Sequence, residues 1–148
     1  MALQYIASVQ FGEITRSRIV NTKEIAEEYN IPVELLAKVL QTLAKSGVIE
    51  SYNGPKGGYL LARKAGAITI AQVLEAIEGP LGITDCYHEK DASSCLQHEH
   101  CTIRTPLLKV QDSIYQLLNS MTVEDMMGGG MPLITVQSLT TAAEGVER

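Results

Sequence analysis

Apolar and polar positions alternate with helical spacing over the first part of the chain and then with the spacing of a short hairpin. Helical spacing predicts helices over residues 2–11, 21–29 and 32–46, of which the last two are separated by a short break. Two short β-favouring runs, 48–52 and 59–62, then flank a glycine-rich turn and predict a β-hairpin. Residues 21–63 are therefore predicted to form, in order, a helix, a tight turn, a second helix and a β-hairpin.

The second half contains two more helical patterns with an irregular stretch between them. A helix begins at Thr69 and stops at Gly79–Pro80, whereas residues 82–103 have no sustained period. A long helix follows, and its apolar positions repeat in alternating steps of four and three, which is a heptad-like seam. The seam consists of Ile103, Leu107, Val110, Ile114, Leu117 and Met121.

The pattern predicts a mostly α fold with one small β-hairpin (α+β), namely a winged helix-turn-helix plus a long dimerisation helix. We expect the winged domain at 1–80, a cysteine-bearing sensor loop at 81–103, the dimerisation helix at 104–127 and a flexible tail at 128–148. An apolar seam on a monomer would be exposed, so a homodimer is expected.

Composition narrows the class of protein. The chain has 148 residues, 45% hydrophobic and 20% charged, as in a globular domain. It has no apolar stretch of about 18 residues and no secretory signal, so we expect a cytoplasmic protein without a membrane partner. The net charge of −5 is uneven, because residues 65–101 alone carry −5 whereas residues 22–64 carry +1. The first half can therefore still bind double-stranded DNA if its cations share one face.

In a winged helix-turn-helix, the second helix enters the major groove of DNA while the hairpin lies along the backbone or minor groove. Lysine addresses guanine or phosphate, glutamine pairs with adenine, and the glycines of the hairpin let backbone amides approach phosphate. The competing interpretation is an ordinary helical domain whose polar stripe is merely solvated. The candidate DNA-binding residues are Lys38, Gln41, Thr42, Lys45, Asn53 and Lys56.

Three cysteines, Cys86, Cys95 and Cys101, lie within the irregular stretch and none lies elsewhere. No pair has Cys-x-x-Cys spacing, which disfavours thioredoxin-type chemistry and zinc knuckles. Three thiolates on one loop can converge on an iron–sulfur cluster, zinc or copper(I). Their histidine neighbours could complete a Cys₃His zinc site, and three unconnected cysteines remain the alternative. These histidines are His88, His98 and His100.

The motifs of common enzyme classes are missing from the sequence. It has no glycine-rich phosphate loop, no Gly-x-Ser-x-Gly and no His-Glu-x-x-His. We therefore expect neither an enzyme nor a small-molecule substrate.

Several of these motifs together resemble the winged-helix transcription regulators of the IscR and NsrR type, the Rrf2 family. The resemblance covers about residues 1–127 and rests on Gly-Pro-Lys-Gly-Gly-Tyr at 54–59, Glu-Gly-Pro at 78–80 and the three spaced cysteines. It implies a homodimeric bacterial regulator in which the cysteines hold a [2Fe–2S] or [4Fe–4S] cluster. Gain, loss or reaction of that cluster would change operator affinity.

Two departures from the family pattern concern the fourth cluster ligand. In the iron–sulfur regulator branch a histidine three residues after the last cysteine completes the ligand set, and here that position is Arg104. In the nitric-oxide-sensor branch an acidic residue near the N-terminus does so. Family members usually have about ten residues ahead of the position of Met1, so we expect a truncated or misassigned start. The other candidates for the fourth ligand are His88 and His98, while His100 is disfavoured beside Cys101.

The sequence thus predicts a homodimeric DNA-binding transcription regulator that senses iron, redox state or nitric oxide through a cysteine-ligated cluster. Two alternatives remain open. One is a zinc-stabilised protein-interaction module, and the other is a cluster-free thiol-based redox regulator.

Overall fold

Helices and a hairpin enclose one apolar core in the computed structural model, which describes residues 1–11, 18–54, 57–84, 95 and 97–128. The core-forming elements are α1 (Ala2–Phe11), α2 (Thr22–Tyr29), α3 (Val33–Lys45), β1 (Ile49–Tyr52), β2 (Gly58–Leu61), η1 (Ala65–Ala67), α4 (Ile70–Glu78) and α7 (Val123–Met127). Each contributes at least one buried hydrophobic residue, and Val20, just ahead of α2, adds another. The expected mostly helical fold with one small antiparallel sheet is confirmed.

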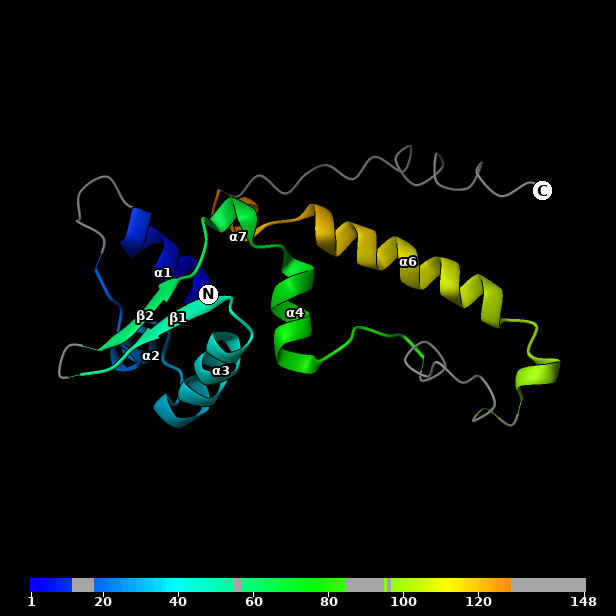
Figure 1. Ribbon diagram of the computed structural model, residues 1–148, viewed down its shortest axis with the longest axis horizontal. Coiled ribbons are helices and arrows are strands. Elements are labelled where there is room, and N and C mark those ends of the chain that lie inside the picture. Colours follow the sequence, from blue (N-terminus) through cyan, green and yellow to red (C-terminus); the bar gives the residue numbers. More distant parts are fainter. Residues whose placement is uncertain (12–17, 55–56, 85–94, 96, 129–148) are drawn as a thin grey trace.

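The remaining helices lie at the opposite end of the molecule. In Figure 1, α6 (Arg104–Ser120) extends away from the core, and η3 (His98–His100) lies beyond its far end. Among the described residues no helix is long and apolar enough to cross a membrane.

Local signals in the sequence place the helix ends. The Asn21 side chain caps α2 by accepting from the amide of Glu24 at 2.8 Å, and Asn30 ends that helix in the left-handed region at φ 51°. The carboxylate of Glu24 pairs with Arg18 and Tyr5. Thr69 caps α4 in a complete capping box with Gln72.

The hairpin is extended by a third segment that the sequence pattern does not reveal. Strands β1 and β2 pair antiparallel from Ile49↔Leu61 to Tyr52↔Gly58. Val20 then pairs with Tyr59 on the other edge of β2, through amide-to-carbonyl bonds of 3.1 and 2.8 Å. Gly58 permits this approach, since a Cβ there would lie 2.3 Å from the Val20 oxygen.

Residues 104–127, expected as one dimerisation helix, form two helices. Helix α6 ends at Ser120 because Met121 is extended and its carbonyl accepts from the amide of Ile70 at 2.8 Å. The amide of Val123 donates to Ile68 at 3.0 Å, and the side chain of Thr122 caps α7. This short bridge between residues 68–70 and 121–123 fixes the C-terminal end of α6 to the start of α4.

Candidate nucleic-acid interface and cysteine segment

Helix α3 presents one polar stripe to solvent. Its inner face is buried through Leu36, Leu40 and Leu43, so the opposite face must point outward. The outward positions follow at intervals of four, three and four residues, which places them in one row along the helix. The exposed side chains of this row are Glu34, Lys38, Gln41 and Lys45.

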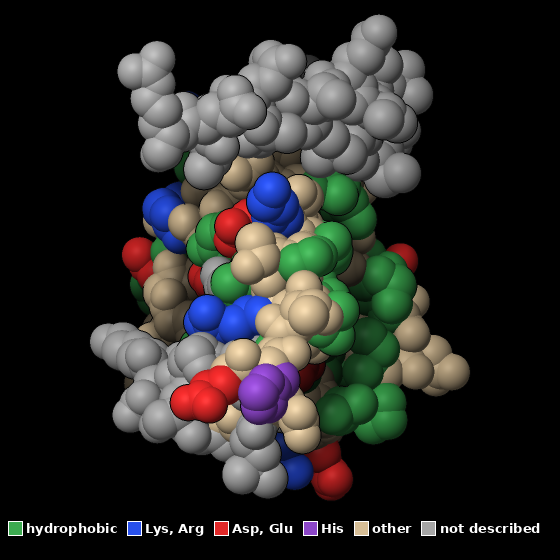
Figure 2. Space-filling view, turned by 90° about the vertical axis from the view of Figure 1, so that its right-hand side faces the viewer, with side chains coloured by type: hydrophobic (Ala, Val, Ile, Leu, Met, Phe, Trp, Pro, Cys, Tyr) green, Lys and Arg blue, Asp and Glu red, His purple; other side chains and the backbone are tan. Residues whose placement is uncertain are grey.

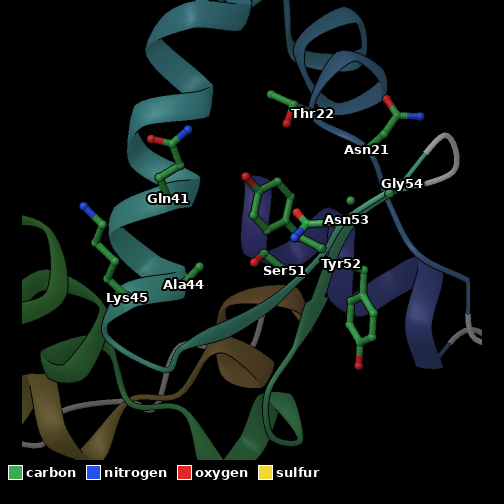
Figure 3. Close-up of a pocket in the computed structure, with 12 residues that line it drawn as sticks. Asn21, Thr22, Gln41, Ala44, Lys45, Ser51, Tyr52, Asn53 and Gly54 are labelled. Carbon is green, nitrogen blue, oxygen red and sulfur yellow. The ribbon is translucent and has the colours of Figure 1, made fainter.

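A groove lies between this stripe, the start of α2 and the hairpin (Figure 3). Its volume is about 620 Å³, and Gln41 and Lys45 line it from two successive turns of α3. Asn53 lines it from the hairpin, where its side chain is exposed. The structure therefore brings together three of the six residues proposed from the sequence.

The other three of these residues have different positions. Lys38 belongs to the exposed stripe but does not line the groove. Thr42 is half-buried, and its hydroxyl donates to the carbonyl of Lys38 at 3.1 Å, so its proton is used within the helix. Lys56 lies outside the described residues.

Charge on the stripe is favourable to a polyanion. Within the described part of the chain, no acidic side chain pairs with Lys38 or Lys45. Both ammonium groups are therefore available to phosphate or to base edges. Glu34, at the N-terminal end of the same row, is an acceptor that suits the amino group of cytosine.

Sequence reasoning missed the contribution of the start of α2 and of the two strands to this groove. Asn21, the cap of α2, and Thr22, its first residue, line the groove on one side, and Ser51 and Tyr59 line it from the hairpin. In Figure 3 the ring of Tyr52 extends from the hairpin on the side away from α3. The sequence pattern begins a helix at residue 21, but the place of that helix start beside α3 depends on the tertiary fold.

A hydrogen bond from α1 and an ion pair from Arg18 hold the start of α2 in place. Arg18 donates to both carboxylate oxygens of Glu24, one of them at 2.9 Å, and the Tyr5 hydroxyl donates to the same carboxylate at 2.7 Å. The Arg18 guanidinium holds the pKa of Glu24 below its ordinary value, whereas the hydrogen bond to the carboxylate raises the pKa of Tyr5. The ring of Tyr5 also meets Tyr29 edge to face at 6.0 Å. These contacts fix the side of the groove formed by α2.

Two of the three cysteines lie in the described part of the chain. Cys95 and Cys101 are free thiols of intermediate exposure, while Cys86 and His88 lie outside the described residues. His98 and His100 belong to η3, and His100 is exposed. The described residues contain no group of three donors that could hold a metal ion. Thiol sulfur is nevertheless the donor type that iron–sulfur clusters require.

Arg104 is the first residue of α6, three positions after Cys101. Its Nε is buried and has no hydrogen-bond partner among the described residues. A guanidinium has no lone pair to offer a metal, so this position cannot supply a ligand.

Helix α6 has one face packed inside the molecule and one that lacks a partner. Gln111 is buried on the inner face, where α6 packs against α4. On the seam, Ile103, Val110 and Ile114 are 61%, 48% and 41% exposed. Figure 2 faces this end of the molecule and shows hydrophobic side chains gathered along one side of it. An apolar row of this kind is typical of an interface between protein chains.

The comparison with protein families gives a match over almost the whole described chain. The model of the family Rrf2, described as "Iron-dependent Transcriptional regulator", matches residues 2–129.

Individual proteins give the same picture. The transcriptional regulator NsrR of Oceanobacillus iheyensis is 28% identical over 121 residues, which cover 82% of each chain. The solved structure of T. potens IscR is 26% identical with a TM-score of 0.62, covering 90% of this chain and 83% of that one. The structure of CymR, the global cysteine regulator of B. subtilis, has a TM-score of 0.61 at 22% identity. The match covers 86% of this chain and 90% of the CymR chain and supports the fold.

Proposed function

Because the chain belongs to the Rrf2 family of transcriptional regulators, we propose that it binds operator DNA as a homodimer and senses a signal through its cysteines. The family membership makes it a DNA-binding regulator rather than an enzyme. We also propose that it acts in the cytoplasm.

The observation that carries the DNA-binding part is the exposed stripe of α3 beside the groove. Lys38, Gln41 and Lys45 lie on the outer face of the helix that enters the major groove in this fold. Asn53 is proposed to contact DNA from the hairpin. Lys56 is proposed as a second DNA contact there from the sequence alone. Thr42 stays on the proposed face, where it offers a methyl group and an acceptor rather than a proton.

The DNA-binding part is tested by operator selection from random duplexes followed by titration of variants. Lys38→Ala and Gln41→Ala are each expected to weaken the selected operator by about 1–3 kcal/mol and to relax the preference at one base pair. Lys56→Ala is expected to weaken all sequences alike and to reduce the slope of affinity against salt by about one. Gln116→Ala, on the exposed far side of α6, is the control. Unchanged operator binding by the Lys38/Gln41 double variant would refute the assignment of α3.

The exposed seam of α6 supports the homodimer. A second copy would cover the apolar side chains of the seam, and twofold symmetry would set two copies of α3 at a fixed spacing on DNA. The bridge between residues 68–70 and 121–123 joins α6 rigidly to the winged domain, so the dimer helix can set that spacing.

For the cysteines we propose a [2Fe–2S] or [4Fe–4S] cluster held by Cys86, Cys95 and Cys101. Two free thiols on the described residues, together with the family's description as iron-dependent, support this choice. When bound, the cluster would supply a metal centre whose loss or reaction alters the charge and restraint of residues 81–103. The fourth ligand must come from elsewhere than Arg104, and His88, His98, an acidic residue upstream, water or a small thiol are the candidates.

A cluster-free thiol regulator is the second candidate, favoured by the free, partly accessible Cys95 and Cys101 and by the likeness to CymR in fold. A zinc-stabilised site is the third. Anaerobic iron, sulfide and zinc analysis with absorption spectra separates them. Iron and sulfide with thiolate-to-iron absorption support the cluster, and serine at any one cysteine should then cause rapid loss of iron. Stoichiometric zinc in a colourless protein, or no metal at all, would favour the alternatives.

A further inference from the structure

Gln111 is a buried polar side chain in the middle of α6, only 3% exposed. Its Nε2 donates to the carbonyl of Leu81 at 2.9 Å, and its Oε1 accepts from the amide of Ile83 at 2.7 Å. One side-chain amide therefore pairs with two backbone groups of the same short segment, as a neighbouring strand would. The contact fixes residues 81–83 in one register against α6.

Packing alone does not account for an amide at this position. A buried amide costs free energy unless it is hydrogen-bonded, and an apolar residue could fill the same space against α4 without that cost. The difference is that an apolar residue would not select one position of the backbone of residues 81–83. A satisfied buried polar group is best suited to specifying such a position.

The place of this contact in the chain suggests what it is for. Ile83 precedes Cys86 by three residues, and Arg104, the start of α6, follows Cys101 by three. The hydrogen bond between Gln111 and Ile83 thus joins α6 to the chain just ahead of the segment that carries all three cysteines. At its other end, α6 is bonded to the start of α4 through residues 121–123. A continuous set of contacts therefore leads from the cysteine segment through α6 to the DNA-binding domain.

We propose that Gln111 is the positioning residue that couples the state of the cysteines to operator affinity. This role rests on the proposed function, because it needs a regulator whose affinity changes with its cysteine segment. With Gln111 in place, a change at the cysteines displaces α6. Without it, residues 81–83, which include Gly82, take up the change locally. Gln111 contacts neither DNA nor metal and acts through the backbone of Leu81 and Ile83.

The test uses Gln111→Met, which keeps the length and apolar volume of the side chain but removes both hydrogen bonds. Gln116→Met, the same change at an exposed position of the same helix, is the matched control. Ile83→Pro removes the backbone amide that Gln111 accepts from, at a side chain that is 49% exposed, and leaves α6 unchanged. Two quantities are measured on the full-length proteins. They are the ratio of operator affinities with and without anaerobically loaded iron and sulfide and, for every protein except Ile83→Pro, which has no amide at this position, hydrogen exchange at the Ile83 amide.

Wild type and Gln116→Met are expected to show slow exchange at Ile83 and an affinity ratio of about 5–150, as is usual for allosteric coupling. Gln111→Met is expected to show fast exchange and a ratio below about two, while one of its two affinities stays at the wild-type value. Ile83→Pro should give the same collapsed ratio. A purely structural role would lower thermal stability and leave the ratio unchanged.

The outcomes distinguish this role from the proposed function. If wild type responds and Gln111→Met responds equally, the coupling role is wrong and the proposed function stands. If wild type itself has equal affinities in both states, the proposed sensing fails and the coupling role fails with it. If both Gln111→Met and Ile83→Pro unfold, the contact is a stabilising one and the coupling role is overturned.

Discussion

Replacing Ile114 by aspartate is expected to dissociate the proposed dimer without unfolding the protomer. Ile114 is 41% exposed on the seam of α6, between Val110 and Leu117. Complete burial of an isoleucine is worth about 1.5–3 kcal/mol, so covering the exposed part contributes about 0.6–1.2 kcal/mol. A twofold interface contains the residue twice, which gives about 1.2–2.5 kcal/mol, or about a sevenfold to sixtyfold change in Kd for Ile114→Ala.

Aspartate adds a second cost. Two carboxylates would be placed in an apolar interface, at several kcal/mol per unpaired ion. The total for Ile114→Asp exceeds about 4 kcal/mol, which raises Kd by about a thousandfold or more. Operator affinity should fall with it, because a monomer holds only one α3 on DNA.

Light scattering and sedimentation over nanomolar to micromolar concentration measure this effect, with circular dichroism to verify that the protomer is folded. Gln116→Asp introduces the same charge at an exposed position about half a turn away from the seam and is the control. Dimeric wild type, dimeric Gln116→Asp and monomeric Ile114→Asp are expected. A wild type that is monomeric at micromolar concentration, or an Ile114→Asp variant as dimeric as the control, would refute the interface.

Three further predictions concern individual contacts. Glu24→Gln should cost about 0.5–1 kcal/mol at neutral pH, since the pair with Arg18 is partly exposed. The folded-state pKa of Glu24 is lowered, so the full difference in stability between wild type and Glu24→Gln should be present above pH 4.5 and should vanish as the pH falls through the folded-state pKa. Thermal melts at several pH values measure this difference, and a difference that stays constant with pH would contradict the prediction. Gly58→Ala should destabilise the protein by about 1–3 kcal/mol, because the new Cβ would lie 2.3 Å from the backbone carbonyl oxygen of Val20. Chemical denaturation measures this loss, and an unchanged free energy of unfolding would disprove the contact. Arg104→His should slow the loss of iron from an anaerobically loaded protein, as expected from the family pattern, and an unchanged rate would place the fourth ligand elsewhere.

The sequence was a good guide where a structural signal is local. The short break after Tyr29, the stop at Gly79 and the hairpin around its glycines all depend on a few neighbouring residues. The outward stripe of α3 followed from periodicity in the same way. These features are fixed by backbone geometry and by which residues avoid water.

Long-range contacts were beyond the sequence pattern. The heptad-like seam continues through Met121, yet α6 ends at Ser120 because Met121 pairs with Ile70 about fifty residues away. Gln111 looks like a surface position on a helix until the fold places residues 81–83 against it. Thr42, proposed from the sequence as a DNA-binding residue, likewise has its hydroxyl bonded to the preceding turn of its own helix.

The central claim is that operator affinity depends on the cysteines, and one paired titration tests it most directly. An operator duplex selected with the wild-type protein is titrated anaerobically with the same preparation before and after its iron and sulfide are removed by a chelator, at one fixed salt concentration. The account predicts a difference in Kd of at least about fivefold that disappears when any one of Cys86, Cys95 and Cys101 is replaced by serine. Equal affinities of the loaded and stripped wild-type protein would contradict it.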